Sequence, residues 1–61
     1  MVTVYSKESC TFCEQAKQYL ESNNIQYTEV DIENNQKARE WILEQGHRSV
    51  PQIYIDNELI E

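Results

Sequence analysis

The chain of 61 residues has very little glycine or proline, with one of each. Flexible linkers and low-complexity segments depend on such residues, so their scarcity indicates one continuous folded domain. Basic residues are scarce too: 5 Lys and Arg stand against 11 Asp and Glu, and the formal net charge is −6. Because the chain also has no run of basic residues, we expect it to bind neither nucleic acid nor an anionic membrane.

Long apolar stretches are missing as well. No segment approaches the roughly 20 apolar residues of a transmembrane helix, and the N-terminus lacks the basic and apolar regions of a signal peptide. We therefore expect a cytoplasmic protein. With 39% apolar residues in 61 positions, the chain should form a single small domain over residues 1–61, near the lower limit of what a hydrophobic core supports.

The chain has only two cysteines, in the segment Cys10-Thr11-Phe12-Cys13. At this spacing the first thiol can attack a disulfide in a partner, and the second can resolve the mixed disulfide. In a reducing cytosol such a pair is more often catalytic than structural. Cys10 is the expected nucleophile, since it precedes a predicted helix whose unpaired N–H groups favour a thiolate. Cys13 should be more shielded and act as the resolving thiol.

Two other interpretations of the cysteine pair stay open. A C-x-x-C segment can be half of a zinc site, but a structural zinc site takes four ligands. The chain offers only Cys10, Cys13 and His47 of the usual kinds, and we predict no metal site. A purely structural disulfide is the other interpretation, although it would close a very small loop and constrain the unfolded chain little.

Hydrophobic patterning predicts the element order βαβαββ. The predicted strands cover residues 2–5, 25–32, 50–55 and 58–61, and the predicted helices cover residues 11–22 and 36–45. The apolar residues at helical spacing in the first helix are Phe12, Ala16, Tyr19 and Leu20. The expected stop signals are Asn23-Asn24 and Gly46, and Asp56-Asn57 fits a hairpin turn. A crossover followed by a hairpin gives a four-stranded mixed sheet, with the cysteines at the carboxyl end of the first strand, where α/β sheets tend to place ligand sites.

Three further segments accompany the cysteine pair: Val4-Tyr5-Ser6-Lys7, Val30-Asp31-Ile32, and residues 46–55 with Ser49-Val50-Pro51. Together they resemble the glutaredoxin family, whose active site is usually Cys-Pro-Tyr-Cys and whose second signature is Thr-Val-Pro. The resemblance spans nearly the whole chain. It implies an α/β, thioredoxin-like fold, glutathione-dependent disulfide exchange, and a cis peptide bond before Pro51 that faces the cysteines.

The resemblance also implies the partners and the binding residues. Glutathione would serve as reductant and co-substrate, and the substrates would be disulfide-containing or glutathionylated proteins, with ribonucleotide reductase a typical client. The backbone of Val50, next to Pro51, would pair with the cysteine part of glutathione. Lys7 would favour the thiolate or bind a glutathione carboxylate. Thr11 and Phe12 would flank the nucleophile.

Other basic residues are harder to assign from the sequence. Family members often carry a Gln or Arg on the second helix that binds the glycine carboxylate of glutathione, but Ala38 comes nearest that position, between Lys37 and Arg39. Arg48 could serve instead. We expect His47 to be an exposed loop residue, because thiolate attack needs no base once the thiol is ionised.

Two departures from the family pattern affect these expectations. Glutaredoxins continue past the hairpin with Gly-Gly and an acidic pair that open a third helix, whereas this sequence stops at Glu61. We therefore expect a fold truncated before that helix, weaker glutathione affinity, and an exposed apolar patch on a monomer or weak dimer. Thr11 stands where the family usually has proline. In some members a non-proline residue at this position accompanies a [2Fe–2S] cluster, which is held between two subunits with glutathione. An iron–sulfur carrier and a thioredoxin-like redoxin reduced by a flavoprotein reductase are the alternative functions.

Overall fold

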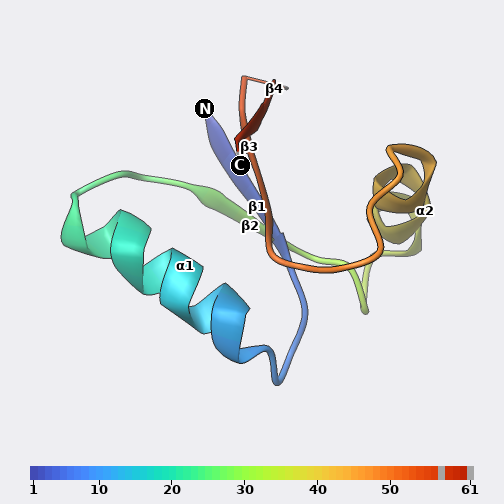
Figure 1. Cartoon of the computed structure of the whole chain (residues 1–61), viewed down its shortest axis with the longest axis horizontal. Coiled ribbons are helices and arrows are strands. Elements are labelled where there is room, and N and C mark those ends of the chain that lie inside the picture. Colours follow the sequence, from blue (N-terminus) through green and yellow to red (C-terminus); the bar gives the residue numbers. More distant parts are fainter. Residues whose placement is uncertain (57, 61) are drawn as a thin grey trace.

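Figure 1 shows the computed structural model of the chain, which describes residues 1–56 and 58–60. The elements in chain order are β1 (Val2–Ser6), α1 (Thr11–Ser22), β2 (Thr28–Asp31), α2 (Gln36–Glu44), β3 (Gln52–Ile55) and β4 (Glu58–Ile60). This order confirms the predicted βαβαββ arrangement. No helix within the described residues is both long and apolar enough to cross a membrane.

The four strands form one mixed sheet in the order β2-β1-β3-β4. Strand β1 runs parallel to β2, with Val4 opposite Glu29, and antiparallel to β3, with Val4 opposite Ile53. Strands β3 and β4 form the predicted antiparallel hairpin. Asp56 has a φ of 49° between these two strands, as tight hairpin turns require. The other residue of the predicted turn, Asn57, lies outside the described residues.

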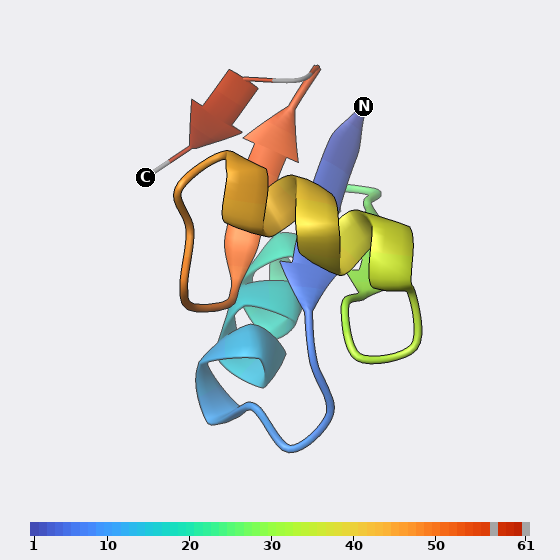
Figure 2. The same cartoon turned by 90° about the vertical axis from the view of Figure 1, so that its right-hand side faces the viewer.

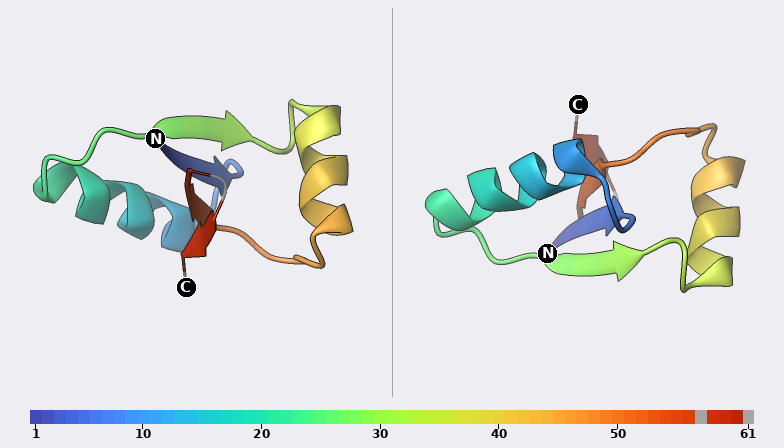
Figure 3. Two further views of the ribbon diagram at one scale, coloured as in Figure 1. Left: turned by 90° about the horizontal axis from the view of Figure 1, so that it is seen from above. Right: turned by 90° about the horizontal axis from the view of Figure 1, so that it is seen from below.

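The two helices cover opposite faces of the sheet (Figure 3), and α2 lies across the strands β1 and β3 (Figure 2). On the α2 face, Trp41 stacks on Tyr5 with ring centroids 5.5 Å apart and meets Tyr54 edge-on at 5.3 Å. Because side chains alternate along a strand, Val4 and Ser6 point to the α1 face, where both are buried. The central strand β1 thus contributes to the core on both faces.

Helix α1 packs on the sheet through Cys13 and Leu20, which are buried, with Ala16 and Lys17 half-buried between them. Two of the apolar residues that mark this helix in the sequence do not face the sheet. Phe12 is 71% exposed and Tyr19 is 67% exposed. The helix face that packs on the sheet therefore differs from the one that the aromatic spacing predicted. The small Cys13 is buried in place of the large Phe12.

Both helices end as their stop signals predict. Asn24 has a φ of 58° and the next amide, of Ile25, donates to the carbonyl of Leu20 at 2.9 Å. Gly46 has a φ of 89° and the following amide, of His47, donates back into α2. Since the Ile25 amide completes the helix cap, β2 begins only at residue 28, and the predicted strand over 25–32 was too long.

The third strand is also shorter than predicted. It begins at Gln52, two residues after the expected start at Val50. Pro51 has no N–H for a strand ladder, and the peptide bond before it is cis, as the family resemblance implied. The strand therefore starts just after the proline.

Candidate active site

The two cysteines lie where the carboxyl end of β1 leads into helix α1. They form a disulfide, with Cα atoms 5.2 Å apart. Cys10 is the N-cap of α1, and its Sγ accepts a hydrogen bond of 3.1 Å from the backbone N–H of Cys13. Cys10 is half-buried, whereas Cys13 is fully buried. The geometry therefore gives one partly exposed cysteine with an N–H directed at its sulfur, which favours its thiolate on reduction, and one shielded cysteine.

A short loop connects β1 to Cys10 and is held by the segment that follows β2. The amide of Ile32 donates to the carbonyl of Ser6 at 2.9 Å, and the amide of Glu8 donates to Glu33 Oε1 at 2.9 Å. Ser9, just before the nucleophile, has a φ of 58°. These bonds fix the approach of the chain to the first cysteine.

The segment that holds this loop is itself ordered by Asp31. One carboxylate oxygen accepts from the backbone N–H of Glu33 at 2.8 Å, and the other accepts from Asn34 Nδ2 at 2.7 Å. The bond from the Asn34 side chain and then that from the Glu33 amide lower the pKa of Asp31. The carboxylate at the end of β2 thus stays ionised at neutral pH.

Residues 49–51 approach the cysteines from the opposite end of the sequence. The carbonyl oxygen of Val50 lies 3.9 Å from Cys10 Sγ, across 40 residues of chain. Val50 is half-buried, and the Val50–Pro51 peptide bond is cis. The structure thus brings Val50, which precedes the cis Pro51, close to the cysteine pair, an arrangement that the family resemblance implied.

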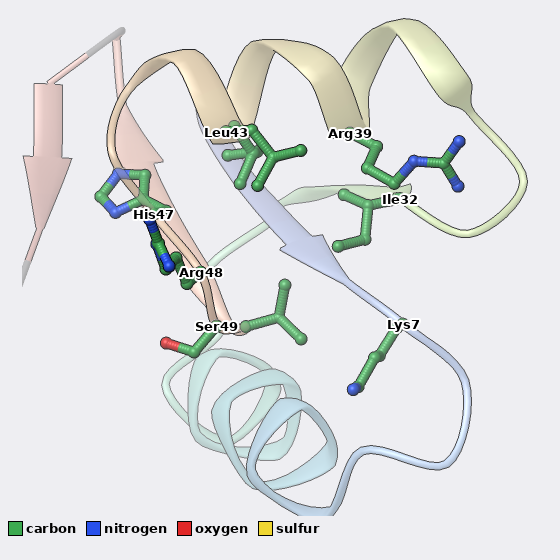
Figure 4. Close-up of a pocket in the computed structure, with 9 residues that line it drawn as sticks. Lys7, Ile32, Arg39, Leu43, His47, Arg48 and Ser49 are labelled. Carbon is green, nitrogen blue, oxygen red and sulfur yellow. The ribbon is translucent and has the colours of Figure 1, made fainter.

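A pocket of about 190 Å³ opens beside Val50, between α2 and the loop that precedes the cysteines (Figure 4). Its lining residues are Lys7, Ile32, Arg39, Ile42, Leu43, His47, Arg48, Ser49 and Val50. Three of them are cationic, four are aliphatic, and none of the described residues that line it is acidic. In a chain with a net charge of −6, this is a distinct cationic site with an apolar wall.

The predicted binding residues divide between the pocket and its surroundings. Lys7 and Val50 line it, whereas Thr11 and Phe12 do not: they lie on the first turn of α1, where both are exposed. Arg39 is the residue that the sequence left unassigned. Helical spacing could have indicated it, because Arg39 lies four positions before Leu43 and both line the pocket.

His47 differs from the expectation of an exposed loop residue. It is half-buried, it lines the pocket, and its Nε2 lies 2.8 Å from the hydroxyl oxygen of Tyr54. The reason is the helix cap at Gly46, which turns the chain so that the His47 amide bonds back to Ile42. Nothing in the local sequence specifies that contact with β3.

Metal ligands are not clustered in the part of the chain that the structure describes. Within residues 1–56 and 58–60, no group of three or more His, Cys, Asp or Glu side chains could hold a metal ion. A zinc site at the cysteine pair would need further ligands of this kind.

The comparisons with known proteins agree with this geometry. Residues 2–60 match the family described as Glutaredoxin. This chain belongs to the glutaredoxin family. The result confirms the resemblance inferred from the sequence, and with the cysteine pair it assigns the chain to the thiol–disulfide oxidoreductases.

The relatives include both glutaredoxins and glutaredoxin-like redoxins. Glutaredoxin 3 of Escherichia coli is 38% identical over 60 residues, which are 97% of this chain and 72% of that protein. The glutaredoxin-like protein NrdH of Lactococcus lactis subsp. cremoris is 37% identical over 57 residues, which are 93% of this chain and 79% of that protein. A solved structure, the thioredoxin-like protein BC3987, superposes with a TM-score of 0.89 at 31% identity and covers 98% of this chain and 84% of its own. The thioredoxin-like fold is confirmed.

Proposed function

We propose that this protein is a glutathione-dependent oxidoreductase that reduces protein disulfides and glutathione mixed disulfides through Cys10 and Cys13. The observation that carries the proposal is the cationic pocket next to the accessible sulfur. Glutathione has two carboxylates and one ammonium group, so its net charge is negative. Lys7, Arg39 and Arg48 complement that charge, and the nearby Val50 backbone can pair with the cysteine part of the tripeptide.

The proposed reaction with a glutathione mixed disulfide uses Cys10 alone. The Cys10 thiolate attacks the glutathionyl sulfur, and the other half of the disulfide leaves as a thiolate that takes a proton from water. A second glutathione thiolate then attacks the Cys10–glutathione disulfide, which releases glutathione disulfide and restores Cys10. With a protein disulfide, Cys13 instead attacks the Cys10 sulfur of the mixed disulfide and releases the reduced protein.

Thr11 and Phe12 take a different role in this proposal. Both are exposed on the first turn of α1 beside Cys10, and they offer a surface for the protein part of a substrate. Ribonucleotide reductase is a proposed client of this kind. We expect the reaction to take place in the cytoplasm, where the glutathione pool is kept reduced.

A second candidate is a redoxin reduced by a flavoprotein reductase rather than by glutathione. It is supported by the relatives named NrdH, which are as similar to this chain as the glutaredoxins are. The third candidate, a glutathione-assisted [2Fe–2S] carrier, rests on Thr11 alone. Anaerobic reconstitution with iron and sulfide would test it, because a colourless protein would end that hypothesis.

The choice of reductant decides between the first two candidates. The oxidised protein is incubated with NADPH and either glutathione with glutathione reductase or a thioredoxin reductase, and reduction of the Cys10–Cys13 disulfide is followed by thiol labelling. Our proposal predicts rapid reduction in the first mixture. Reduction by the thioredoxin reductase alone would reject glutathione and support the redoxin.

A further inference from the structure

A hydrogen-bonded ion pair ties helix α1 to both neighbouring strands. Ser6 is 1% exposed and donates its hydroxyl hydrogen to Glu29 Oε2 at 2.8 Å. Lys17 Nζ lies 2.8 Å from the same oxygen and 2.9 Å from Glu14 Oε1. One carboxylate oxygen on β2 therefore links a buried hydroxyl on β1 to an ammonium group on α1. We call Ser6, Glu29 and Lys17 the α1 clamp.

The clamp lies on the helix face that carries the buried cysteine. Lys17 follows Cys13 by four residues, which places both side chains on one face of α1. The Lys17 side chain is only 16% exposed, and its neighbours on that face, Ala16 and Leu20, are apolar. An apolar residue would pack there without needing a partner, so a lysine at this position requires an explanation.

The strand side of the clamp runs from the buried Ser6 to the edge of the helix–sheet interface, where the Glu29 side chain is 43% exposed. Glu29 is opposite Val4 in the sheet, and Val4 and Ser6 are both buried on the α1 face. The hydrogen bonds from Lys17 and then from Ser6 lower the pKa of Glu29, and the bond to Glu29 raises the pKa of Lys17. Both groups therefore stay charged at neutral pH.

We propose that the α1 clamp positions Cys13 for the resolving step of thiol–disulfide exchange, with Lys17 and Glu29 as positioning residues. In this step the Cys13 thiol loses its proton to solvent, and its thiolate attacks the Cys10 sulfur of a mixed disulfide. The Cys10–Cys13 bond forms, and the partner's thiolate leaves with the electron pair of the broken bond. Cys13 is fully buried, so the first turns of α1 hold its sulfur against the sheet, and the clamp one turn further along the helix limits how far these turns can shift.

The clamp offers a way to separate positioning from a simple charge effect. Removing the Lys17 ammonium leaves the carboxylates of Glu14 and Glu29 without their cation, and their negative charge disfavours a thiolate at Cys13. Removing the Glu29 carboxylate has the opposite electrostatic effect. If the clamp acts by position, both changes slow the resolving step; if it acts by charge, they change its rate in opposite directions.

The test is a stopped-flow reaction of the reduced protein with dithiobis(nitrobenzoate). The first nitrothiobenzoate is released when Cys10 attacks the reagent, and the second when Cys13 resolves the mixed disulfide, so the second phase does not depend on reagent concentration. We expect Lys17→Met and Glu29→Val each to slow the second phase by about tenfold and to leave the first phase unchanged. The matched control is Lys37→Met on α2, which should change neither phase.

Three results would overturn the proposal: an unchanged second phase in both variants, a second phase that Glu29→Val accelerates, or a proportional loss of both phases. If Lys17→Met or Glu29→Val prevents folding, Ser6→Ala provides the test, because it removes only one hydroxyl. The proposal predicts that Ser6→Ala also slows only the second phase. Lys17→Arg should retain much of the wild-type rate. The inference rests on the proposed exchange chemistry at Cys10 and Cys13. The assay contains no glutathione, so it tests the clamp even if the protein does not use glutathione.

Discussion

Cys10 Sγ lies 3.9 Å from the carbonyl oxygen of Val50, although 40 residues separate them in the sequence. The contact joins the redox centre to the pocket, because Val50 also lines the cavity that Lys7 and Arg39 share. A substrate sulfur bonded to Cys10 therefore has a cationic site beside it. In the proposed function, this contact is what joins the disulfide chemistry of Cys10 to binding of an anionic thiol in the pocket.

The pocket cations should control the Michaelis constant for glutathione. Each of Lys7→Gln and Arg39→Gln removes a charge from the pocket that we propose binds the glutathione carboxylates, and we expect the KM to rise about three- to tenfold with a smaller change in kcat. Lys37→Gln is the matched control, since Lys37 lies on the same helix but lines a different groove. Steady-state kinetics with varied glutathione make the measurement. A KM that is equal in all four proteins would contradict the assignment of the pocket.

Phe12 should act on protein substrates rather than on stability. Its side chain is 71% exposed, so Phe12→Ala should change the free energy of unfolding by less than about 0.5 kcal/mol. If the ring contacts the substrate, the kcat/KM for a protein disulfide should fall about three- to tenfold. Tyr19→Ala, which removes another exposed ring of α1, serves as the control. Equal kcat/KM values for the two variants would reject a specific role of Phe12.

Two neighbouring residues of α2 should differ sharply in their contribution to stability. Ile42 is 2% exposed, and Ile42→Ala should lower the free energy of unfolding by about 2–5 kcal/mol because it leaves a cavity in the core. Leu43 is 57% exposed, and Leu43→Ala should cost less than about 1 kcal/mol. Urea denaturation followed by Trp41 fluorescence measures both. Similar losses in the two variants would show that α2 packs on the sheet in a different orientation.

Acid should weaken the loop that Asp31 orders. The pKa of this carboxyl is lowered in the folded protein, so its contribution to stability is present above the ordinary aspartate pKa of about 3.9 and is lost as the pH falls through the lower folded value. Asp31→Asn should therefore be destabilised relative to wild type at pH 7, and the difference should shrink below about pH 4. Denaturation curves at several pH values test this, with Glu40→Gln as an exposed control. If the difference in free energy of unfolding between wild type and Asp31→Asn grew on acidification, it would contradict a stabilising role of the Asp31 carboxylate.

The sequence predicted those features that local chemistry determines. Helix ends follow from residues that tolerate a positive φ, which is why Asn24 and Gly46 could be located in advance. The parallel pairing of β1 with β2 and the antiparallel pairing of β3 with β4 follow from a crossover and a hairpin, whereas the pairing of β1 with β3 was not predicted. The cis bond before Pro51 was implied by the family signature and not by any local rule.

Features that depend on contacts between distant segments could not be predicted in the same way. Which face of α1 packs on the sheet depends on which side chain fits against the strands. Cys13 is buried there, whereas Phe12 is exposed. His47 is half-buried through its contact with Tyr54 on β3. Arg39 lines the same pocket as Lys7 because α2 packs next to the loop that carries Lys7, and helical spacing alone does not specify that packing.

The most direct test of the central claim is turnover of a small glutathione mixed disulfide with glutathione, NADPH and glutathione reductase, in wild type, Cys10→Ser and Cys13→Ser. Our account predicts that Cys10→Ser abolishes turnover, since the accessible sulfur is lost, and that Cys13→Ser retains it, since glutathione itself completes the cycle. No turnover by the wild-type protein, or turnover that persists in Cys10→Ser, would contradict the account.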